Sequence, residues 1–282
     1  MDRDGPAGSA VVRASWAPGR DGPSHRAEMT TQWLCGQVLD VLEEDGSWLR
    51  GRGPDGYESW VGRGSLLRLS PARAEAWRRE ATAISLGVRL RDVDGGGASL
   101  PGPGRAAPPR RLPWGARVVP AEGGGVRLPD GTSARPASPD ALAGPSERER
   151  RFPPEPTAVV RTALRWVGAP YLWGGRTPEG ADCSGLVQAV HAVHGVDLPR
   201  DSGQQLEAGP GIRAPDAEPG DLLFFGDDRR SVTHVAMVVE EATILHAAED
   251  NGAVALDDLS AERPLPRRLR RRLVGATRPA SA

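Results

Sequence analysis

The chain has 282 residues, 38% of them hydrophobic and 26% charged, and its formal net charge at pH 7 is -1. These values are typical of a soluble globular protein with enough apolar residues for a core, and they argue against nucleic acid or anionic lipid as a partner. No apolar run reaches the roughly 18 residues that a membrane span needs, so none is predicted.

The N-terminal residues and the two cysteines bear on the cell compartment. The opening MDRDGP lacks the apolar core of a signal peptide, so we expect a cytoplasmic protein, with an exported form whose leader is absent from this sequence as the alternative. Cys35 and Cys183 lie far apart in unlike surroundings, which argues against a disulfide framework. We expect Cys35 to be a small buried apolar residue and Cys183 to be a free thiol.

Residues 1–70 are predicted to form a small all-β barrel. Short runs of strand-forming residues alternate with turns, and the Asp45-Gly46 and Asp55-Gly56 pairs are hairpin signals. The predicted strands are residues 10–13, 37–43, 48–52 and 58–61.

A connector and a second barrel follow. Residues 71–82 join the two, and the Ala- and Arg-rich stretch 73–83 favours a short helix. A second, poorer barrel is predicted over residues 83–137, with glycine and proline interrupting it from Gly95 to Pro113. Its strands are expected at residues 86–91, 116–120 and 126–129.

A proline-rich segment separates these barrels from the rest of the chain. Residues 138–156 carry several prolines among Ser, Glu and Arg, so we expect an extended linker rather than a helix. Residues 157–276 have a different pattern, with helical periodicity first and strand-forming runs after it. This order predicts one α+β domain with an antiparallel sheet.

Two helices and three strands are predicted in this last domain. Thr157 is the expected cap of a helix that runs to Val167, and a second helix over residues 183–194 ends at Gly195. The strands are expected at residues 222–225, 233–239 and 243–247, with a turn near Glu240.

The sequence around Cys183 predicts a nucleophile. Cys183 lies in the first turn of its predicted helix with Asp182 as the natural cap, where backbone N–H groups and the helix dipole stabilise a thiolate. His234 shares one strand face with Ala236 and Val238. We expect a helix packed on that face to bring the imidazole toward the thiol.

A second histidine completes the predicted constellation. His246 becomes a cross-strand neighbour of His234, so one imidazole can take a proton while the other fixes its orientation. A thiol, a base and an orienting group are the parts of a cysteine hydrolase. One Cys and two His are also metal ligands, but they leave no obvious fourth ligand and lack the paired spacing of zinc sites, so no metal or other cofactor is predicted.

The remaining histidines are assigned no function. We expect His191 on the exposed side of the second helix, His194 at its end and His25 in a loop.

Six short motifs carry a resemblance to a known family, the NlpC-type cell-wall cysteine peptidases. The motifs, in chain order, are YLWGG at 171–175, DCSGLV at 182–187, LPRDS at 198–202, GDLLFF at 220–225, THV at 233–235 and LHA at 245–247. The resemblance implies a papain-like fold in which Cys183 attacks a peptide carbonyl, His234 acts as base and His246 orients it. It also implies that the Tyr171 hydroxyl helps the Cys183 backbone N–H to hold the oxyanion.

The front of the chain extends this resemblance. Residues 23–29, 46–50 and 55–61 are similar to the first bacterial SH3-like barrel of a subgroup that cleaves γ-D-glutamyl bonds in muropeptides. The implied fold class is therefore α+β, a papain-like NlpC-type catalytic domain preceded by two small all-β SH3-like barrels. The implied substrate is L-Ala-γ-D-Glu-diamino acid with a free N-terminus. The implied substrate-binding residues are Asp182, Glu28 and Tyr57 at the ammonium group, and Ser184 and Ser202 elsewhere.

The leading hypothesis is a cysteine endopeptidase, or dipeptidyl-peptidase-like enzyme, acting on the D-Glu to diamino acid bond of stem peptides in muropeptide recycling or turnover. Its partner is the peptidoglycan-derived peptide substrate, nucleic acid is not expected, and the sequence leaves protein partners open. Two alternatives stay open: a non-catalytic cell-wall-binding protein, and a thiol acyltransferase with an amine acceptor on the same scaffold.

Overall fold

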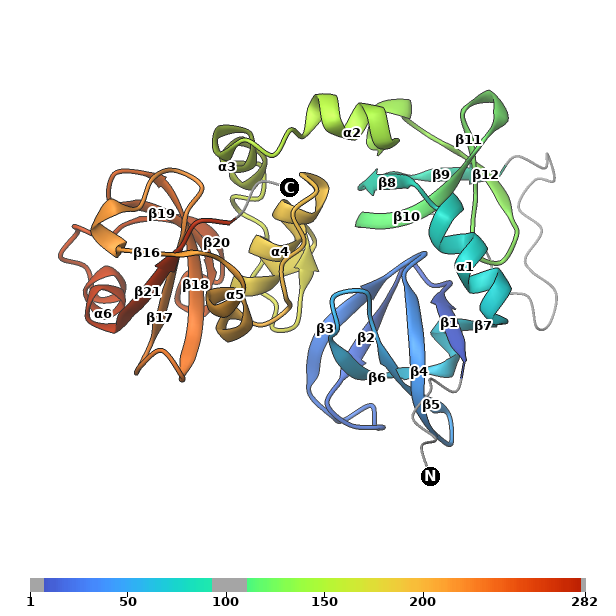
Figure 1. The fold of residues 1–282 in the computed structure, drawn as a ribbon, viewed down its shortest axis with the longest axis horizontal. Helices are drawn as coiled ribbons and strands as arrows, with labels where there is room; N and C mark the ends of the chain where they lie inside the picture. Colours follow the sequence, from blue (N-terminus) through green and yellow to red (C-terminus); the bar gives the residue numbers. More distant parts are fainter. Residues whose placement is uncertain (1–7, 93–110, 280–282) are drawn as a thin grey trace. The chain divides into compact units, whose positions relative to one another are not determined.

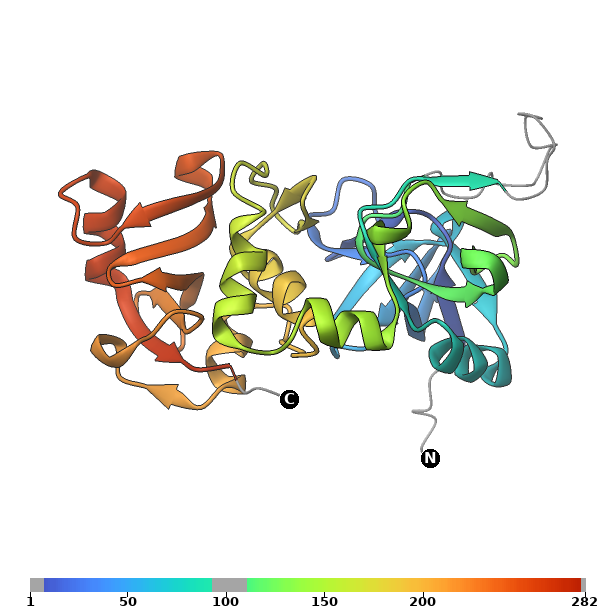
Figure 2. The same ribbon diagram turned by 90° about the horizontal axis from the view of Figure 1, so that it is seen from above.

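The computed structural model describes residues 8–92 and 111–279, and the chain divides into two compact units, Met1–Glu147 and Arg148–Ala282. In Figures 1 and 2 the first unit, coloured from blue to green, consists mainly of strands, whereas the second combines helices with one twisted sheet. The division falls inside the predicted linker. The predicted interruption of the second barrel lies outside the described residues from Gly95 to residue 110.

The first unit begins with a seven-stranded antiparallel sheet. Its strands are β1 (Ser9–Val12), β2 (Trp16–Arg20), β3 (Met29–Leu34), β4 (Val38–Asp45), β5 (Trp48–Arg52), β6 (Glu58–Gly62) and β7 (Leu66–Leu69). They lie in the order β3-β2-β6-β5-β4-β1-β7 around a core that includes Trp33, Leu39 and Val61. The predicted strands are present, and Gly46 and Gly56 have the positive φ that tight turns require.

A helix and a six-stranded sheet follow in the same unit. Helix α1 (Pro71–Glu80) begins after Ser70, whose side chain accepts a hydrogen bond from the Arg73 N–H. The strands of the sheet are β8 (Ala83–Leu86), β9 (Leu90–Asp92), β10 (Trp114–Ala121), β11 (Gly125–Arg127), β12 (Ser133–Pro136) and β13 (Leu142–Ala143). The single strand predicted over residues 86–91 is wrong, because Gly87, with φ +91°, makes a turn that separates β8 from β9.

The two sheets of the first unit share a core at Cys35. Leu34 and Cys35 belong to the apolar cluster of the second sheet, and the Arg117 N–H donates to the Cys35 carbonyl over 2.8 Å. A Cβ on Gly36 would lie 1.9 Å from the Arg117 carbonyl oxygen, so only glycine allows this approach. Cys35 is fully buried, which confirms the prediction of an apolar filler.

The second unit is built on a six-stranded antiparallel sheet. Its strands are β16 (Gly211–Ile212), β17 (Leu222–Gly226), β18 (Val232–Glu240), β19 (Thr243–Ala248), β20 (Ala253–Asp258) and β21 (Leu273–Thr277), in the order β16-β21-β17-β18-β19-β20. The β18–β19 turn contains Glu241 at φ 38°. The prediction of an antiparallel sheet after the helices is confirmed.

The helices of this unit precede and follow the strands. They are α3 (Pro156–Leu164), α4 (Cys183–Val193), α5 (Ser202–Ala208) and α6 (Pro264–Arg272), with a small hairpin of β14 (Arg176–Thr177) and β15 (Gly180–Ala181) ahead of α4. Thr157 is not the cap of α3, because Pro156 already takes the first helical position, where its fixed φ suits the helix. The boundaries predicted for α4 hold to within a residue at its C-terminal end.

The predicted linker contains a helix, which corrects the expectation of an extended segment. Helix α2 (Pro145–Arg151) lies between two groups of prolines and carries Glu and Arg side chains in its interior. Pro145 stands at its first position, where its missing N–H has no intrahelical partner to lose. The prolines therefore bound this helix instead of breaking it.

His191 is buried, not exposed as predicted, and His194, which ends α4 as predicted, is buried as well. His191 is 2% exposed and His194 3% exposed. His191 Nδ1 lies 2.8 Å from the Val187 carbonyl oxygen, and His194 bonds to the Pro153 carbonyl and the Thr162 hydroxyl. The prediction failed because α4 is covered on nearly every side, so its polar residues find partners inside the protein.

We expect the free energy of unfolding to fall as the pH drops from 6.5 toward 4. Burial lowers the pKa of His191 from 6.5 to about 4 in the folded chain. The unfolded chain therefore binds more protons within this window, so stability rises with pH there. Urea unfolding followed by circular dichroism at pH 4.5 and 6.5 measures the effect. His191→Gln should reduce the pH dependence, and an unchanged dependence would contradict this account.

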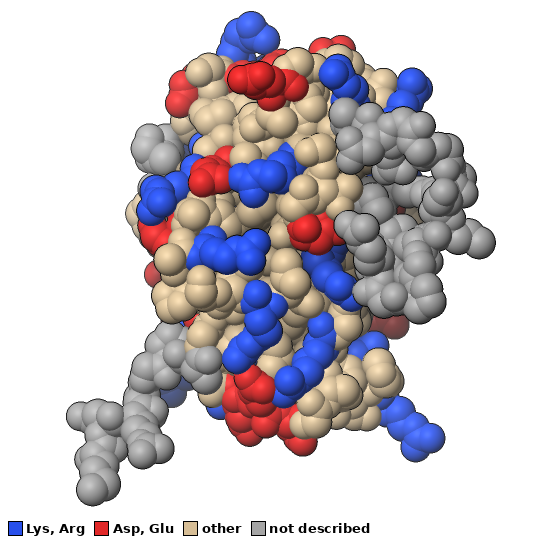
Figure 3. Space-filling view, turned by 90° about the vertical axis from the view of Figure 1, so that its right-hand side faces the viewer, with Lys and Arg blue, Asp and Glu red and all other residues tan. Residues whose placement is uncertain are grey.

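The surface carries both signs of charge. On the face drawn in Figure 3, arginine side chains lie among Asp and Glu side chains. Ion pairs in the first unit include Arg78 with Asp40 and Arg127 with Glu80. Among the described residues, no helix combines the length and the hydrophobicity that crossing a membrane requires.

Candidate active site

Cys183 is the first residue of helix α4, directly after the cap residue Asp182. The Asp182 side chain accepts a hydrogen bond from the Gly185 N–H over 2.7 Å, and the Asp182 carbonyl accepts from the Leu186 N–H. The predicted cap and helix start are therefore present. Cys183 is 9% exposed, so its thiol lies just below the surface.

Three glycines allow the loop before α4 to pack on the helix. Gly174, with φ +77°, donates its N–H to Asp182 Oδ2 over 2.9 Å. The Gly175 carbonyl accepts from the Asp182 N–H, and a Cβ on Gly185 would lie 2.1 Å from that carbonyl oxygen. The Gly-Gly pair and the glycine after Cys183-Ser184 therefore fit together at one close backbone contact, which holds the helix start in place.

We expect Gly185→Ala to destabilise the protein by at least about 2 kcal/mol, because backbone atoms must move to admit the methyl group. Gly203, near the start of α5, is the matched control, since a Cβ there meets no atom within 4 Å. Gly203→Ala should leave stability unchanged or raise it by up to about 1 kcal/mol. Thermal unfolding of both variants measures the difference, and equal effects would show that the close contact is unimportant.

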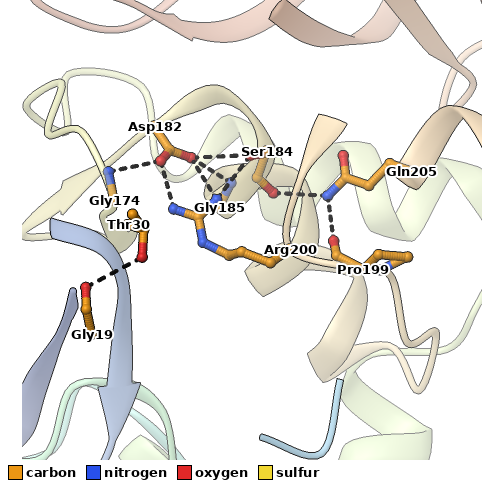
Figure 4. Close-up of polar contacts among 9 residues, drawn as sticks. All are labelled: Gly19, Thr30, Gly174, Asp182, Ser184, Gly185, Pro199, Arg200 and Gln205. Carbon is orange, nitrogen blue, oxygen red and sulfur yellow. Dashed lines mark hydrogen bonds and ion pairs between the residues drawn. The ribbon is translucent and has the colours of Figure 1, made fainter. Parts of the chain in front are cut away.

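Asp182 forms a buried ion pair with Arg200 (Figure 4). Arg200, which is 2% exposed, donates from one terminal nitrogen to Asp182 Oδ2 over 2.6 Å and from the other to Asp182 Oδ1 over 3.1 Å. Arg200 also donates to the Ser184 hydroxyl, which itself lies 3.3 Å from Asp182 Oδ1. The carboxylate of Asp182 is thus occupied by donors of this chain, and its binding of a substrate ammonium group stays a prediction.

The thiol of Cys183 is held in its neutral form. Burial and the nearby Asp182 raise its pKa to about 12, whereas the backbone N–H groups of Val235 and Ser184 and the Arg200 charge oppose the rise. The predicted stabilisation of a resting thiolate at the helix N-terminus is therefore outweighed by burial. A base that removes the proton during reaction is needed.

The thiol meets strand β18 at the residue after His234. The Val235 N–H is close enough to the Cys183 sulfur to lower the pKa of the thiol. Ala236 and Val238 pack in the same cluster as Leu269 of α6, so the strand face that His234 shares with them is the α6 face. The predicted route, in which the thiol-bearing helix covers that face, was wrong.

His234 and His246 form a hydrogen-bonded pair, as the cross-strand placement predicted. His234 Nε2 lies 2.8 Å from His246 Nδ1, and His246 Nε2 lies 3.0 Å from Asp257 Oδ2. Burial, followed by the neighbouring His246, lowers the pKa of His234 to about 3, so this imidazole is neutral at pH 7. A neutral imidazole can accept the proton of the thiol.

Tyr171 lies close to the nucleophile. Burial first, and then the proximity of Cys183 and Asp182, raises the pKa of Tyr171 to about 12, so its hydroxyl keeps its proton at neutral pH. The Tyr171 N–H donates to the Gly252 carbonyl over 2.9 Å, which ties the loop to the turn before β20. The hydroxyl can therefore donate a hydrogen bond, as an oxyanion-binding group must.

The remaining predicted residues are placed as follows. Ser202 is the first residue of α5 and 8% exposed, and Ser184 is bonded to the Asp182–Arg200 pair. Glu28 is exposed ahead of β3, and Tyr57 packs against the core of the first sheet. Both belong to the first unit, whereas the thiol and the histidines belong to the second. The roles assigned to these residues stay predictions.

Two polar residues at this site were not singled out from the sequence. Arg200 stands inside the LPRDS motif, which was the available signal for it. Asp257 is 2% exposed in β20, whereas the preceding Leu256 is 44% exposed. A strand that buries its carboxylate and exposes its leucine departs from the usual pattern, and that departure becomes visible only in the structure.

Comparisons with known proteins identify two domains in the chain. Residues 168–271 match the NlpC/P60 family, and residues 19–66 match the bacterial dipeptidyl-peptidase SH3 domain. A γ-D-glutamyl-L-lysine dipeptidyl-peptidase of Bacillus cereus is 33% identical over 139 residues, 48% of this chain and 41% of that protein. Dipeptidyl-peptidase 6 of Lysinibacillus sphaericus is 28% identical over 279 residues, 92% of this chain and 94% of that protein.

A solved structure supports the fold over nearly the whole chain. The crystal structure of an NlpC/P60 family protein from Bacillus cereus matches with a TM-score of 0.79 at 19% identity, covering 96% of this chain and 99% of that one. The predicted fold class, all-β SH3-like sheets followed by an α+β domain, is confirmed. Residues 168–271 are therefore an NlpC/P60 domain, and a bacterial dipeptidyl-peptidase SH3 domain lies ahead of it in the chain.

Proposed function

We propose that the protein is a cysteine peptidase that hydrolyses the bond between γ-D-Glu and the diamino acid in peptidoglycan stem peptides. One observation carries the chemistry. The Cys183 thiol lies at the Val235 N–H, directly after His234, whose imidazole is bonded to His246. A thiol, a neutral base and a group that can orient the base are the parts that a cysteine peptidase needs.

The first half of the reaction acylates the thiol. His234 takes the proton as the Cys183 sulfur attacks the γ-carbonyl carbon of D-Glu. The oxygen of that carbonyl becomes an oxyanion, which the Cys183 backbone N–H and the Tyr171 hydroxyl stabilise. The C–N bond then breaks, His234 returns its proton to the departing amine of the diamino acid, and a thioester on Cys183 remains.

The second half releases the dipeptide. A water molecule loses a proton to His234 and attacks the thioester carbonyl. The carbon–sulfur bond breaks and the thiol is protonated again. Since the pKa of His234 is lowered and that of Cys183 raised, neutral forms of both groups persist at pH 7, ready for another cycle.

The choice of substrate is supported by the comparisons. The names of two similar proteins specify dipeptidyl-peptidases, one of them for γ-D-glutamyl-L-lysine. The match of residues 19–66 to the SH3 domain of bacterial dipeptidyl-peptidases supports the same group. We therefore propose L-Ala-γ-D-Glu-diamino acid, with its free amine, as the substrate. A small free peptide of this kind fits the proposed cytoplasmic role in muropeptide recycling.

Product analysis tests the proposal. We expect purified protein to release L-Ala-γ-D-Glu from L-Ala-γ-D-Glu-L-Lys or from its diaminopimelate counterpart. Acetylation of the L-Ala amine should lower kcat/KM strongly, whereas Glu28→Gln and Tyr57→Phe should raise KM for the free-amine peptide. Failure to cleave any stem peptide while binding insoluble peptidoglycan would instead favour a wall-binding protein. Transfer of the dipeptide to an added amine in place of water would favour an acyltransferase.

A further inference from the structure

We propose that Asp257 is a positioning residue that fixes the direction of the hydrogen bonds through His246 and thereby leaves Nδ1 of His234 free to take the proton of Cys183. This inference rests on the proposed role of His234 as the base. Asp257 was not among the residues predicted from the sequence, and it lies on β20, two strands away from His234.

The burial of Asp257 needs an explanation. The carboxylate is 2% exposed, and a buried charge is costly unless donors surround it. Three donors do so: Asn251 Nδ2 lies 2.8 Å from Oδ2, Arg263 lies 2.5 Å from Oδ1, and His246 Nε2 lies 3.0 Å from Oδ2. Asn251 and Arg263 hold the carboxylate, so it presents Oδ2 to the histidine pair.

The direction of each hydrogen bond follows from the chemistry of the partners. The hydrogen bond with His246, followed by that with Asn251, lowers the pKa of Asp257 to about 2, so the group is an acceptor at neutral pH. The neutral form of His246 then carries its one proton on Nε2, which leaves Nδ1 as an acceptor. His234 Nε2, 2.8 Å away, must donate to it. The single proton of neutral His234 is thus on Nε2, and Nδ1 has its lone pair free.

A histidine pair does not define this direction by itself. Neutral His246 can also carry its proton on Nδ1, donate to His234 Nε2 and so force the His234 proton onto Nδ1. In that arrangement His234 has no free lone pair for the thiol. The Asp257 carboxylate can only accept a hydrogen bond. It therefore fixes the proton of neutral His246 on Nε2 and, with it, the direction of the bond between the two histidines.

Other charged groups near His234 do not replace this effect. Asp250 of the turn after β19 raises the pKa of His234 and Arg268 of α6 lowers it, but these two side chains pair with each other over 2.5 Å. Cys183 on α4 is neutral at pH 7. None of these groups is hydrogen-bonded to His246 in the described structure, whereas Asp257 is.

Two substitutions distinguish the effect of Asp257 on the direction of the hydrogen bonds from the effect of its negative charge. Asp257→Leu removes the acceptor, and we expect kcat to fall by roughly 100-fold with KM little changed. Asp257→Asn keeps an oxygen for His246 while its amide nitrogen turns toward Arg263, which is 61% exposed and can move away. We expect Asp257→Asn to recover most of the loss and to shift the acid limb of the kcat/KM profile to lower pH, because the negative charge that favours imidazolium is gone. Asp258→Asn, an exposed change of the same charge on the same strand, should match wild type.

Nitrogen-15 NMR of the histidine rings in the Cys183→Ala background provides a readout that needs no substrate. We expect His234 as the Nε2–H tautomer when Asp257 is present, and a mixture of tautomers in the Asp257→Leu variant. His234 found as the Nδ1–H tautomer with Asp257 present, or unchanged tautomers in Asp257→Leu, would overturn the proposal. If Asp257→Leu does not fold, the tautomer of His234 in the protein that keeps Asp257 still tests the proposal. If the tautomers are as expected but the wild-type protein cleaves no stem peptide, the proposed function is refuted and the role of Asp257 in fixing the hydrogen bonds is not.

Discussion

Replacing Cys183 with Ala is expected to lower kcat/KM on L-Ala-γ-D-Glu-diamino acid by roughly 10⁴-fold or more, because no other step of the mechanism supplies a nucleophile. The fold should persist, since Ala is a good helix former and the substitution removes only the sulfur atom. The cap by Asp182 and the contact between Gly175 and Gly185 remain intact. Initial rates, with circular dichroism on the same samples, measure both parts.

The second cysteine provides the matched control. Cys35 is fully buried in the first unit, and burial raises the pKa of its thiol to about 12. Cys35→Ala should lose about 1 kcal/mol of stability and keep its kcat/KM. Retained activity in Cys183→Ala, or its loss on adding a chelator to wild type, would favour the metal alternative instead.

Replacing Arg200 with Met is expected to destabilise the protein by about 3 to 5 kcal/mol, the largest stability effect in this account. The substitution leaves the Asp182 carboxylate, 5% exposed, without the cation that neutralises it. The Ser184 hydroxyl loses its Arg200 donor as well. Because Asp182 caps α4, the start of the helix should loosen and activity should fall together with stability. Urea unfolding measures the first effect and initial rates the second.

The control for Arg200 is an exposed ion pair of the same type. Arg78 pairs with Asp40 over 2.7 Å with both side chains more than 40% exposed, so Arg78→Met should cost between 0 and about 1 kcal/mol. In an Asp182→Asn background the cost of Arg200→Met should shrink, since the buried charge is gone. Equal costs for Arg200→Met and Arg78→Met would show that burial does not strengthen this pair.

The order of the elements and the location of the thiol could be predicted from the sequence because local signals determine them. Helix α4 has an Asp cap, apolar residues at helical spacing and Gly195 with φ +83° after its end. Strand β5 has the predicted bounds because its alternating residues follow a Gly turn. The cross-strand pairing of the histidines followed from the turn near Glu240.

Some strands and buried polar residues could not be predicted from the sequence, because their local residue patterns are not typical of what they form. Strand β3 buries Thr31 and Gln32, so its polar residues conceal a core strand. Strand β2 contains Pro18 and Gly19, which are usually depleted in strands. His191 and Asp257 are polar residues that the fold buries against specific partners. His191 is buried because α4 is covered on nearly every side, and Asp257 is buried because its three donors come together only in the folded chain, so no local pattern reveals either burial.

The central claim is that Cys183 carries the acyl group of the substrate during turnover. Rapid acid quenching of the enzyme with L-Ala-γ-D-Glu-diamino acid, followed by intact-protein mass spectrometry and peptide mapping, tests it directly. The account predicts one L-Ala-γ-D-Glu acyl group on the peptide that contains Cys183, and none in Cys183→Ala. An acyl group on another residue, or peptide cleavage that persists in Cys183→Ala without any acyl-enzyme, would contradict it.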